Sequence, residues 1–173
     1  IQFIKIREPG GTRNSEKIRK LILNNRSNFN KNSDLLLYLA SRSENIDFLK
    51  KNYKKKVILI DRFTDSTIAY QVYGKKVDFN FINNIHKIIL EGLKPNIVFI
   101  LKVSKNSSKR RLLKRRTKNR YDNFPQSFYS KAQRSFIKIS KDKKNYFVMD
   151  SSKNDDTLEK RIFNIVSKKL KIS

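Results

Sequence analysis

Three short runs of apolar and aromatic residues most constrain the fold of this chain. They span residues 57–60, 97–101 and 146–149, and no charged residue interrupts them. A strand that helices cover on both faces shows such a run, whereas a strand with one face in water alternates apolar and polar residues. Segments with helical spacing of apolar residues lie between the runs. The pattern therefore predicts an α/β fold with a parallel sheet covered by helices on both faces.

The strand predicted at 57–60 leads directly into charged residues. Asp61 and Arg62 follow it, at the edge of a parallel sheet where ligands bind. Asp65 or Ser66 can cap a short helix after them. That helix would carry the polar residues Thr67, Tyr70 and Gln71 toward the same crevice. The arrangement indicates a pocket for a phosphorylated ligand with a polar ring, although a surface ion pair before a capped helix remains the alternative.

A second strand end has similar chemistry. Residues 1–6 alternate and run into Arg7 and Glu8, which the Pro-Gly-Gly sequence of 9–11 follows. The glycines stop the strand and let the backbone approach a ligand closely. Arg19 lies on the next predicted helix, beside its apolar face. An ordinary strand-to-helix turn would explain the same residues.

The helix predicted over 34–49 carries an aromatic residue and an arginine on one face. Tyr38 and Arg42 are four residues apart, so they are neighbours on a helix surface. A ring and a guanidinium so placed can stack on a flat base and bind its edge. Spacing alone equally permits a core tyrosine beside a solvated arginine.

The chain is strongly basic, with 41 Lys and Arg against 15 Asp and Glu, a formal charge of +26. Such an excess is typical of proteins that bind polyanions. A compositional bias toward Lys, Asn, Ile and Phe would produce it without any such function. The densest cationic segment, residues 109–122, would be satisfied by a phosphate chain, but a solvated basic surface is the alternative.

Other features exclude several classes of protein. The chain has no Cys, so it forms no disulfide and no thiolate metal site. No stretch approaches the roughly 20 apolar residues that span a bilayer, and charged residues interrupt the first segment, which is therefore not a signal peptide. We expect a cytoplasmic protein. His86 lies on a predicted helix and is expected to be an ordinary surface or packing residue.

Five segments together resemble bacterial thymidylate kinases in order and spacing. They are REPGGT at 7–12, LLYLASR at 36–42, DRFTDSTIAYQ at 61–71, KPNIVFIL at 94–101 and RYD at 120–122. The resemblance implies a P-loop nucleoside monophosphate kinase fold as a single domain over 1–173. It also implies transfer of the γ-phosphoryl group of ATP to dTMP with Mg²⁺, giving dTDP for dTTP synthesis.

The resemblance also implies roles for individual residues. Arg62 would hold the acceptor phosphate, and Asp61 would help to organise the phosphates and the metal. Tyr38 would stack on thymine and Arg42 would bind the base edge. Tyr70 would lie against the deoxyribose and disfavour a 2′-hydroxyl. Thr67 and Gln71 would complete base recognition. Glu8 and Arg19 would line the acceptor side.

The segment at about 111–122 is similar to the mobile lid of these kinases. Arg115 would act in catalysis, and the donor phosphates would meet Arg111, Arg115 and Arg120. A cationic enclosure suits phosphoryl transfer, because charge spreads over the transferring oxygens. No metal site is expected from the side chains of the chain alone.

One departure from the family is large. The pattern G-x-x-x-x-G-K-[ST], whose backbone amides, Lys and hydroxyl hold ATP and Mg²⁺, is absent from the 173 residues. We therefore expect the sequence to lack the first strand and P-loop of the family at its N-terminal side, and to be inactive as it stands.

Two other functions stay open from the residues alone. One is a nucleoside monophosphate kinase for a different base, because Arg42, Thr67 and Gln71 could serve several bases. The other is a basic nucleic-acid-binding protein, with cations along one continuous face and exposed aromatic rings. With the resemblance, dTMP and ATP are the expected partners and nucleic acid and membranes are not. A homodimer through the helices at 34–49 and 79–90 is also implied.

Overall fold

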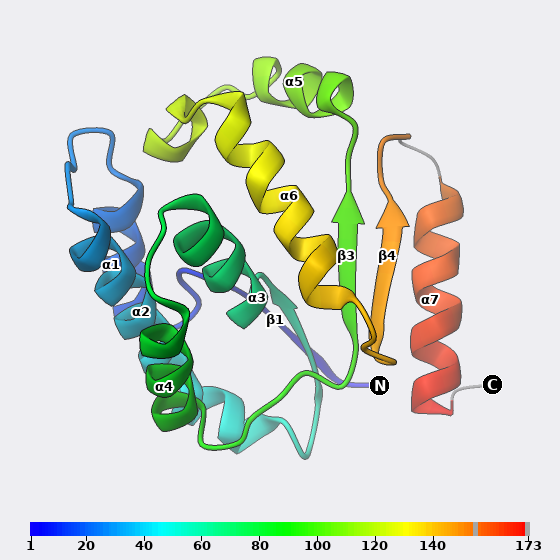
Figure 1. The fold of residues 1–173 in the computed structure, drawn as a ribbon. Helices are drawn as coiled ribbons and strands as arrows, with labels where there is room; N and C mark the ends of the chain where they lie inside the picture. The colour runs from blue at the N-terminus through cyan, green and yellow to red at the C-terminus, as the bar shows by residue number, and fades with distance from the viewer. Residues whose placement is uncertain (154–155, 172–173) are drawn as a thin grey trace. The chain divides into compact units, whose positions relative to one another are not determined.

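The computed structural model describes residues 1–153 and 156–171, which form two compact units. Unit 1 comprises residues 1–95 and 118–139, and unit 2 comprises residues 96–117 and the described residues from 140 onward. Each unit contains its own parallel strands and helices (Figure 1). The single domain over 1–173 stays a prediction.

Unit 1 is built around two parallel strands. Strand β1 (Phe3–Arg7) pairs with β2 (Val57–Asp61), in a register that runs from Phe3 opposite Val57 to Arg7 opposite Asp61. The amide of Glu8 extends the pairing by donating to the carbonyl of Asp61 at 2.9 Å. The two charged strand ends predicted from the sequence therefore lie side by side.

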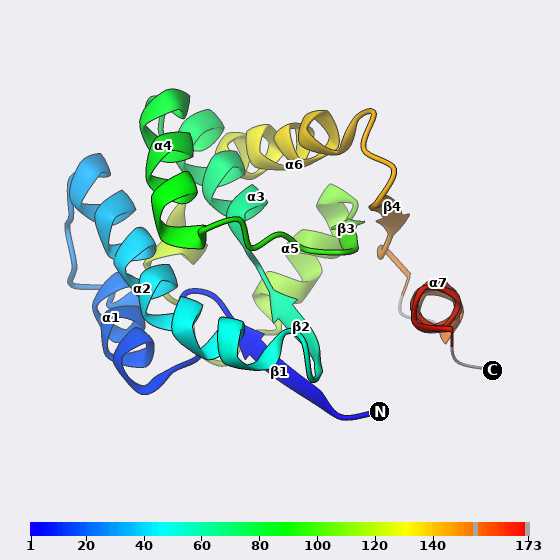
Figure 2. The same cartoon turned by 90° about the horizontal axis from the view of Figure 1, so that it is seen from below.

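Helices pack on this sheet through an apolar core. The helices are α1 (Arg13–Leu23), α2 (Lys31–Asn52) and α4 (Phe79–Leu90). Ile6 of β1 packs with Ile46 and Leu49 of α2, and side chains of β2 and α4 complete the cluster. A second cluster joins α2 to α4 through Leu35 and Ile82. Figure 2 shows α1 and α2 side by side, and this packing holds α2 next to the strand ends.

Helix α2 begins earlier than the sequence predicted. It starts at Lys31, and the Asn30 side chain caps it by accepting from the amides of Asn32 and Ser33. The expectation that Asp34 starts the helix is wrong, because the Asn-rich segment before it supplies the cap. Asp34 instead lies within the first turn of the helix and is buried.

The polar stretch after β2 also differs from expectation. A short helix α3 (Thr64–Thr67) continues as a π-helix, η1 (Ile68–Gly74). The residue before α3 is Phe63, and no side chain caps it, so neither Asp65 nor Ser66 has the expected capping role. The wider π turn changes how Tyr70 and Gln71 project relative to Thr67, and such segments occur often at functional sites.

Two later elements complete unit 1. A 3₁₀ turn, η2 (Arg120–Asn123), precedes α6 (Gln126–Ser140). Phe128 and Phe136 of α6 pack against Tyr70 of η1, with ring centroids 5.8 and 6.0 Å apart. Helix α6 therefore holds the residues that follow β2.

Unit 2 contains the other pair of parallel strands. Strand β3 (Val98–Lys102) pairs with β4 (Tyr146–Asp150), from Val98 opposite Tyr146 to Lys102 opposite Asp150. Its helices are α5 (Lys105–Leu113) and α7 (Asp156–Leu170), and α7 lies alongside β4 (Figure 1). In the described part of the chain, no helix has the length and apolarity needed to cross a membrane.

The expectation of one sheet covered on both faces requires correction. Among the described residues, the strands are hydrogen-bonded as two separate parallel pairs, β1–β2 and β3–β4. Leu59, Leu101 and Val148 are 47%, 49% and 42% exposed, so the apolar runs are only partly covered. Apolar runs predict strands, but strand pairing depends on contacts between distant segments that a run does not encode. The parallel orientation within each pair is confirmed.

Candidate functional site

The candidate site in unit 1 forms where β1 and β2 end. Arg7 and Glu8 follow from β1, and Asp61 and Arg62 follow from β2. Arg62 has a backbone φ of 69°, a left-handed conformation that is costly for a residue with a side chain and clusters at functional sites. Its guanidinium lies 5.3 Å from the centre of the Tyr70 ring. The backbone strain therefore falls on the predicted phosphate-binding residue.

Arg7, Arg19 and Arg62, which we call the arginine cluster, are close enough to affect one another. Burial lowers the pKa of Arg19, and the charges of Arg7 and Arg62 lower it further. The Arg19 side chain donates to the carbonyl of Pro9 at 2.6 Å. Desolvation opposes the charge of Arg62, but Tyr70 and Asp61 outweigh it and raise its pKa. Like charges held together in this way attract an anion, above all a dianionic phosphate.

Arg42 is buried, with 2% of its surface exposed, and four of its N–H groups have partners. Its Nε donates to Oε2 of Glu8 at 2.8 Å, and its Nη2 forms an ion pair with the same oxygen at 2.7 Å. Its Nη1 donates to the Thr67 hydroxyl at 2.9 Å and to Nε2 of His86 at 2.7 Å. A guanidinium has five N–H groups, so one N–H on Nη2 has no partner among the described residues. Arg42 is rigidly oriented with one donor to spare.

His86 of α4 is part of this arrangement. The sequence indicated an ordinary surface or packing residue, but the ring is buried against Arg42. Burial, and then the Arg42 charge, lower the pKa of His86 to about 3. The ring is therefore neutral at physiological pH, and its Nε2 accepts from Arg42. The spacing of residues on the predicted helix did not show that His86 is buried, so no signal in the sequence separates it from a surface histidine.

Two buried acceptors have no partner in the part of the chain that the structure describes. They are Oε1 of Glu8 and Oε1 of Gln71. An unsatisfied buried oxygen costs about 1–3 kcal/mol, and a native protein keeps such a group when a ligand satisfies it. Both lie on residues that the sequence placed in the pocket.

Two tyrosines form an aromatic wall near these groups. The Tyr38 ring meets the Tyr121 ring edge-to-face, with centroids 6.1 Å apart. Burial raises the pKa of Tyr38 and of Tyr121, so both phenols stay protonated at neutral pH. A flat, uncharged ring beside polar groups suits a nucleobase.

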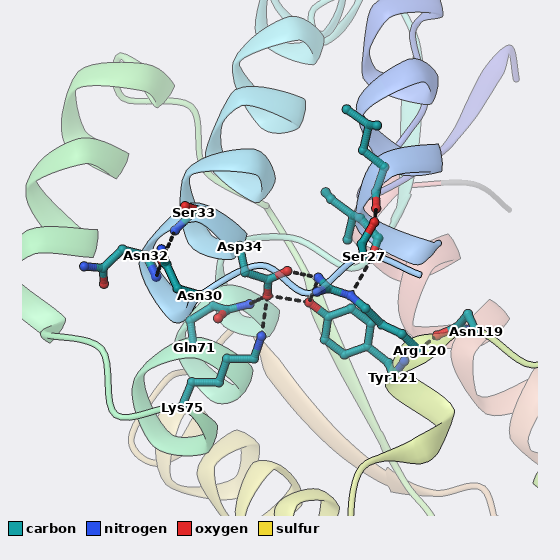
Figure 3. Close-up of polar contacts among 12 residues, drawn as sticks. Ser27, Asn30, Asn32, Ser33, Asp34, Gln71, Lys75, Asn119, Arg120 and Tyr121 are labelled. Carbon is teal, nitrogen blue, oxygen red and sulfur yellow. Dashed lines mark hydrogen bonds and ion pairs between the residues drawn. The ribbon is translucent and has the colours of Figure 1, made fainter. Parts of the chain in front are cut away.

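A buried carboxylate that sequence reasoning missed anchors this wall. Asp34 is ion-paired with Arg120 and with Lys75, and it accepts from the Tyr121 hydroxyl at 2.5 Å (Figure 3). Gln71 Nε2 lies 3.5 Å from the same carboxylate. We call these residues the Asp34 network. Nothing local marked Asp34, because its partners come from distant parts of the chain.

The three lid arginines belong to different units. Arg111 of α5 donates to the carbonyl of Ser151 at 2.5 Å, within unit 2. Arg115 is an exposed residue of the same unit. Arg120 belongs to unit 1, where its Nε also donates to the carbonyl of Ile22 at 2.7 Å. Arg120 therefore makes its hydrogen bonds and its ion pair within unit 1 in this structure.

Among the described residues, no three His, Cys, Asp or Glu side chains gather to hold a metal ion. Mg²⁺ in phosphoryl-transfer sites is commonly held by one or two carboxylates together with substrate phosphates and water. Asp61, exposed at the end of β2, fits that limited role.

Several known proteins are similar to this chain. The family model described as thymidylate kinase matches residues 1–162. The thymidylate kinase of Thermosipho africanus is 35% identical over 171 residues, which are 98% of this chain and 85% of that protein. That of Wolbachia pipientis is 38% identical over 136 residues, 78% of this chain and 66% of that protein.

A solved structure is also similar. The crystal structure of thymidylate kinase from Ehrlichia chaffeensis has a TM-score of 0.74 and 27% identity, and the match covers 96% of this chain and 81% of that one. Family model, relatives and fold agree over nearly the whole length. The chain belongs to the thymidylate kinase family.

Proposed function

We propose that this protein is a phosphotransferase that moves the γ-phosphoryl group of ATP to dTMP, giving dTDP for dTTP synthesis. Membership of the thymidylate kinase family carries the proposal. The arginine cluster and the buried polar groups of Glu8, Arg42 and Gln71 support it, because a nucleoside monophosphate needs both a dianion site and a base site.

The arginine cluster binds the acceptor phosphate. Arg62 makes the central contact, since its strained backbone aims it from the end of β2 and its ring contact with Tyr70 limits its motion. Arg19 and Arg7 add positive charge from α1 and β1. Charge-assisted hydrogen bonds of this type are about twice as strong as neutral ones.

The base lies against Tyr38, and its polar edge meets Arg42, Thr67 and Gln71. The spare N–H of Arg42 donates to a carbonyl oxygen of thymine. Glu8 holds Arg42 in place through one hydrogen bond and one ion-pair contact to the same carboxylate oxygen, so its main effect is positional. The Thr67 hydroxyl, which accepts from Arg42, supports the same orientation.

Tyr70 lies against the deoxyribose. Contacts with Phe128 and Phe136 fix its ring on one side, and Arg62 lies over it. A ring held this firmly cannot move to admit a 2′-hydroxyl, so the pocket favours a deoxynucleotide.

ATP and Mg²⁺ serve as phosphoryl donor and metal. Bound Mg²⁺ neutralises charge on the β- and γ-phosphates, and Asp61 is the carboxylate of this chain that would help to hold it. Arg111, Arg115 and Arg120 of the lid approach the donor, with Arg115 stabilising the transferring group.

The function is tested by calorimetric titration of the protein with dTMP, dUMP, GMP, AMP and a single-stranded oligonucleotide at physiological salt. We expect dTMP to bind most tightly. Tighter binding of another monophosphate would assign a different base, and tight, salt-sensitive binding of the oligonucleotide would favour a nucleic-acid-binding protein.

Turnover is a separate measurement. The 173 residues contain no G-x-x-x-x-G-K-[ST] sequence, so we expect this chain to bind dTMP while transferring phosphoryl groups far more slowly than a kinase that has the loop. Binding of dTMP thus reports on the acceptor site, whereas turnover also requires the donor site.

A further inference from the structure

We infer that Asp34 determines which kind of base the protein accepts, by fixing the orientation of the Gln71 amide. The inference rests on the proposed function and deepens it. It makes Asp34 a positioning residue for base selection, and it requires a ring N–H on the base, as thymine has at N3.

The Asp34 carboxylate is fully buried, with 0% exposed. Arg120 and Tyr121 reach it from η2, while Lys75 and Gln71 reach it from η1 and the residue that follows (Figure 3). The cations keep it ionised, since a buried unpaired carboxylate would take up a proton. An ionised carboxylate accepts hydrogen bonds and donates none.

The amide of Gln71 must therefore turn its Nε2 toward Asp34. The 3.5 Å separation of Nε2 from Oδ2 agrees with that orientation. The opposite orientation would face the amide oxygen toward carboxylate oxygen. Gln71 is 1% exposed, and its Oε1 has no hydrogen-bond partner among the described residues. Asp34 thus leaves a buried acceptor available to a ligand.

Only a donor satisfies that acceptor. Thymine presents an N–H at N3 beside the carbonyl O4, whereas cytosine presents an acceptor at N3 beside an amino group. The spare N–H of Arg42 favours the carbonyl for the same reason. A site with buried polar groups strongly rejects an analogue that leaves them unpaired. Oε1 of Gln71 and the spare N–H of Arg42 together therefore select a base that presents an N–H next to a carbonyl.

Asp34 also positions the ring that faces the base. The Tyr121 hydroxyl donates to Asp34 at 2.5 Å, and Tyr121 supports Tyr38 edge-to-face. One carboxylate therefore controls both the stacking wall and the polar edge of the pocket. A role in packing alone would affect the affinity for every nucleotide equally, whereas the orientation of the amide affects their ratio.

The test uses the charge-balanced double variant Asp34→Asn/Lys75→Met. The Asn amide can donate to Oε1 of Gln71, so the Gln71 amide can reverse and present Nε2 to the base. We expect the ratio of dCMP to dTMP dissociation constants, measured by calorimetry, to fall by about tenfold or more. An unchanged ratio in a variant with wild-type circular dichroism would overturn the inference.

Two matched variants serve as controls. Lys75→Met alone keeps the Asp34 carboxylate. Its ratio of dCMP to dTMP dissociation constants should therefore equal that of the wild type, even if its stability falls. Asp34→Glu also retains an acceptor and should preserve selectivity for dTMP. A reduced ratio in Lys75→Met would assign selection to Lys75 and contradict the role of Asp34.

Gln71→Met covers the case in which the double variant does not fold. It leaves Asp34 with Arg120, Lys75 and Tyr121, and should weaken dTMP binding by about tenfold while affecting dCMP little. An unchanged ratio would show that Oε1 does not select the base. If the wild type binds dTMP and dCMP equally, this inference alone fails; if it binds no nucleotide, the proposed function fails with it.

Discussion

At the scale of single residues, the site depends on charges whose positions the backbone and buried partners hold. Arg62 is held by a left-handed backbone, and Arg42 is held by Glu8, Thr67 and His86. A ligand that binds such groups does not have to order them first, which lowers the entropic cost of binding. The residues differ in what their loss would do: Arg62 is exposed, whereas Arg42 and His86 are buried.

Arg62→Ala should weaken dTMP binding by about tenfold to a hundredfold, because a charge-assisted phosphate contact is lost. The fold should be unaffected. Arg62→Gly should lose binding equally and unfold at the same or higher temperature, since glycine adopts a φ of 69° without strain. Calorimetry and thermal unfolding measure the two effects. Wild-type affinity in either variant would remove Arg62 from the phosphate site.

The buried His86 should make stability depend on pH. Its pKa falls to about 3 in the folded protein from about 6.5 when unfolded, so the unfolded state binds a proton first. Stability is therefore fully present above about pH 6.5 and is lost as pH falls toward 3. His86→Gln, whose amide oxygen can accept from Arg42, should lack this component. Denaturant unfolding of the wild type and of His86→Gln from pH 7 to pH 4 measures this contribution. If the free energies of unfolding of the two proteins change with pH in parallel, His86 does not contribute.

At the scale of elements, the π-helix η1 connects the site to α6. Its last residue, Gly74, lies so close to Phe128 of α6 that an added Cβ would be 2.5 Å from Cε2 of the ring. Phe128 also contacts Tyr70 and Phe124. The glycine therefore permits the close packing of η1 on α6 that positions Tyr70.

Gly74→Ala should lower the free energy of unfolding by about 1–3 kcal/mol, because the methyl group overpacks this contact. Urea denaturation measures the change. Gly74→Ala should lower the free energy of unfolding by less in the Phe128→Leu background than in the wild type, because the smaller leucine side chain leaves room for the methyl group. If the effects of the two substitutions on the free energy of unfolding simply add, the added methyl group does not clash with the Phe128 ring.

At the scale of the whole molecule, exposed apolar side chains on α2 and α4 support the proposed homodimer. Leu36, Phe79, Phe81 and Ile88 are exposed, and Ile88 reaches 74%. Large exposed apolar groups on neighbouring helices are typical of surfaces that another chain covers. These are the helices through which the family resemblance implies a homodimer.

Phe81→Lys/Ile88→Lys should convert a dimer to a monomer in sedimentation velocity, because two charges would be buried at the interface. The secondary structure should be unchanged, since both positions are exposed in the single chain. Glu91→Lys, a charge change just after α4, serves as the control and should keep the dimer. A monomeric wild type would contradict the proposal.

The sequence by itself determined the approximate positions of most strands and helices, because the spacing of apolar residues acts within a few residues, but it did not identify the residues that cap α2 and α3. The helix predicted at 79–90 matches α4, and Arg42 contacts both Glu8 and Thr67 in unit 1. Their roles stay predictions. The π-helix was missed because it differs from an α-helix by one residue per hydrogen bond, which the apolar pattern barely registers.

Only the tertiary structure decided the pairing of the strands and the partners of the buried charges. Asp34 and Arg120 are separated by 86 positions, and neither residue has a local feature that indicates the other. A buried ion needs its countercharge within a few ångströms, and packing of distant segments determines which one is there. For this reason the family was predictable from the sequence, whereas the buried carboxylate that contacts Gln71 was not.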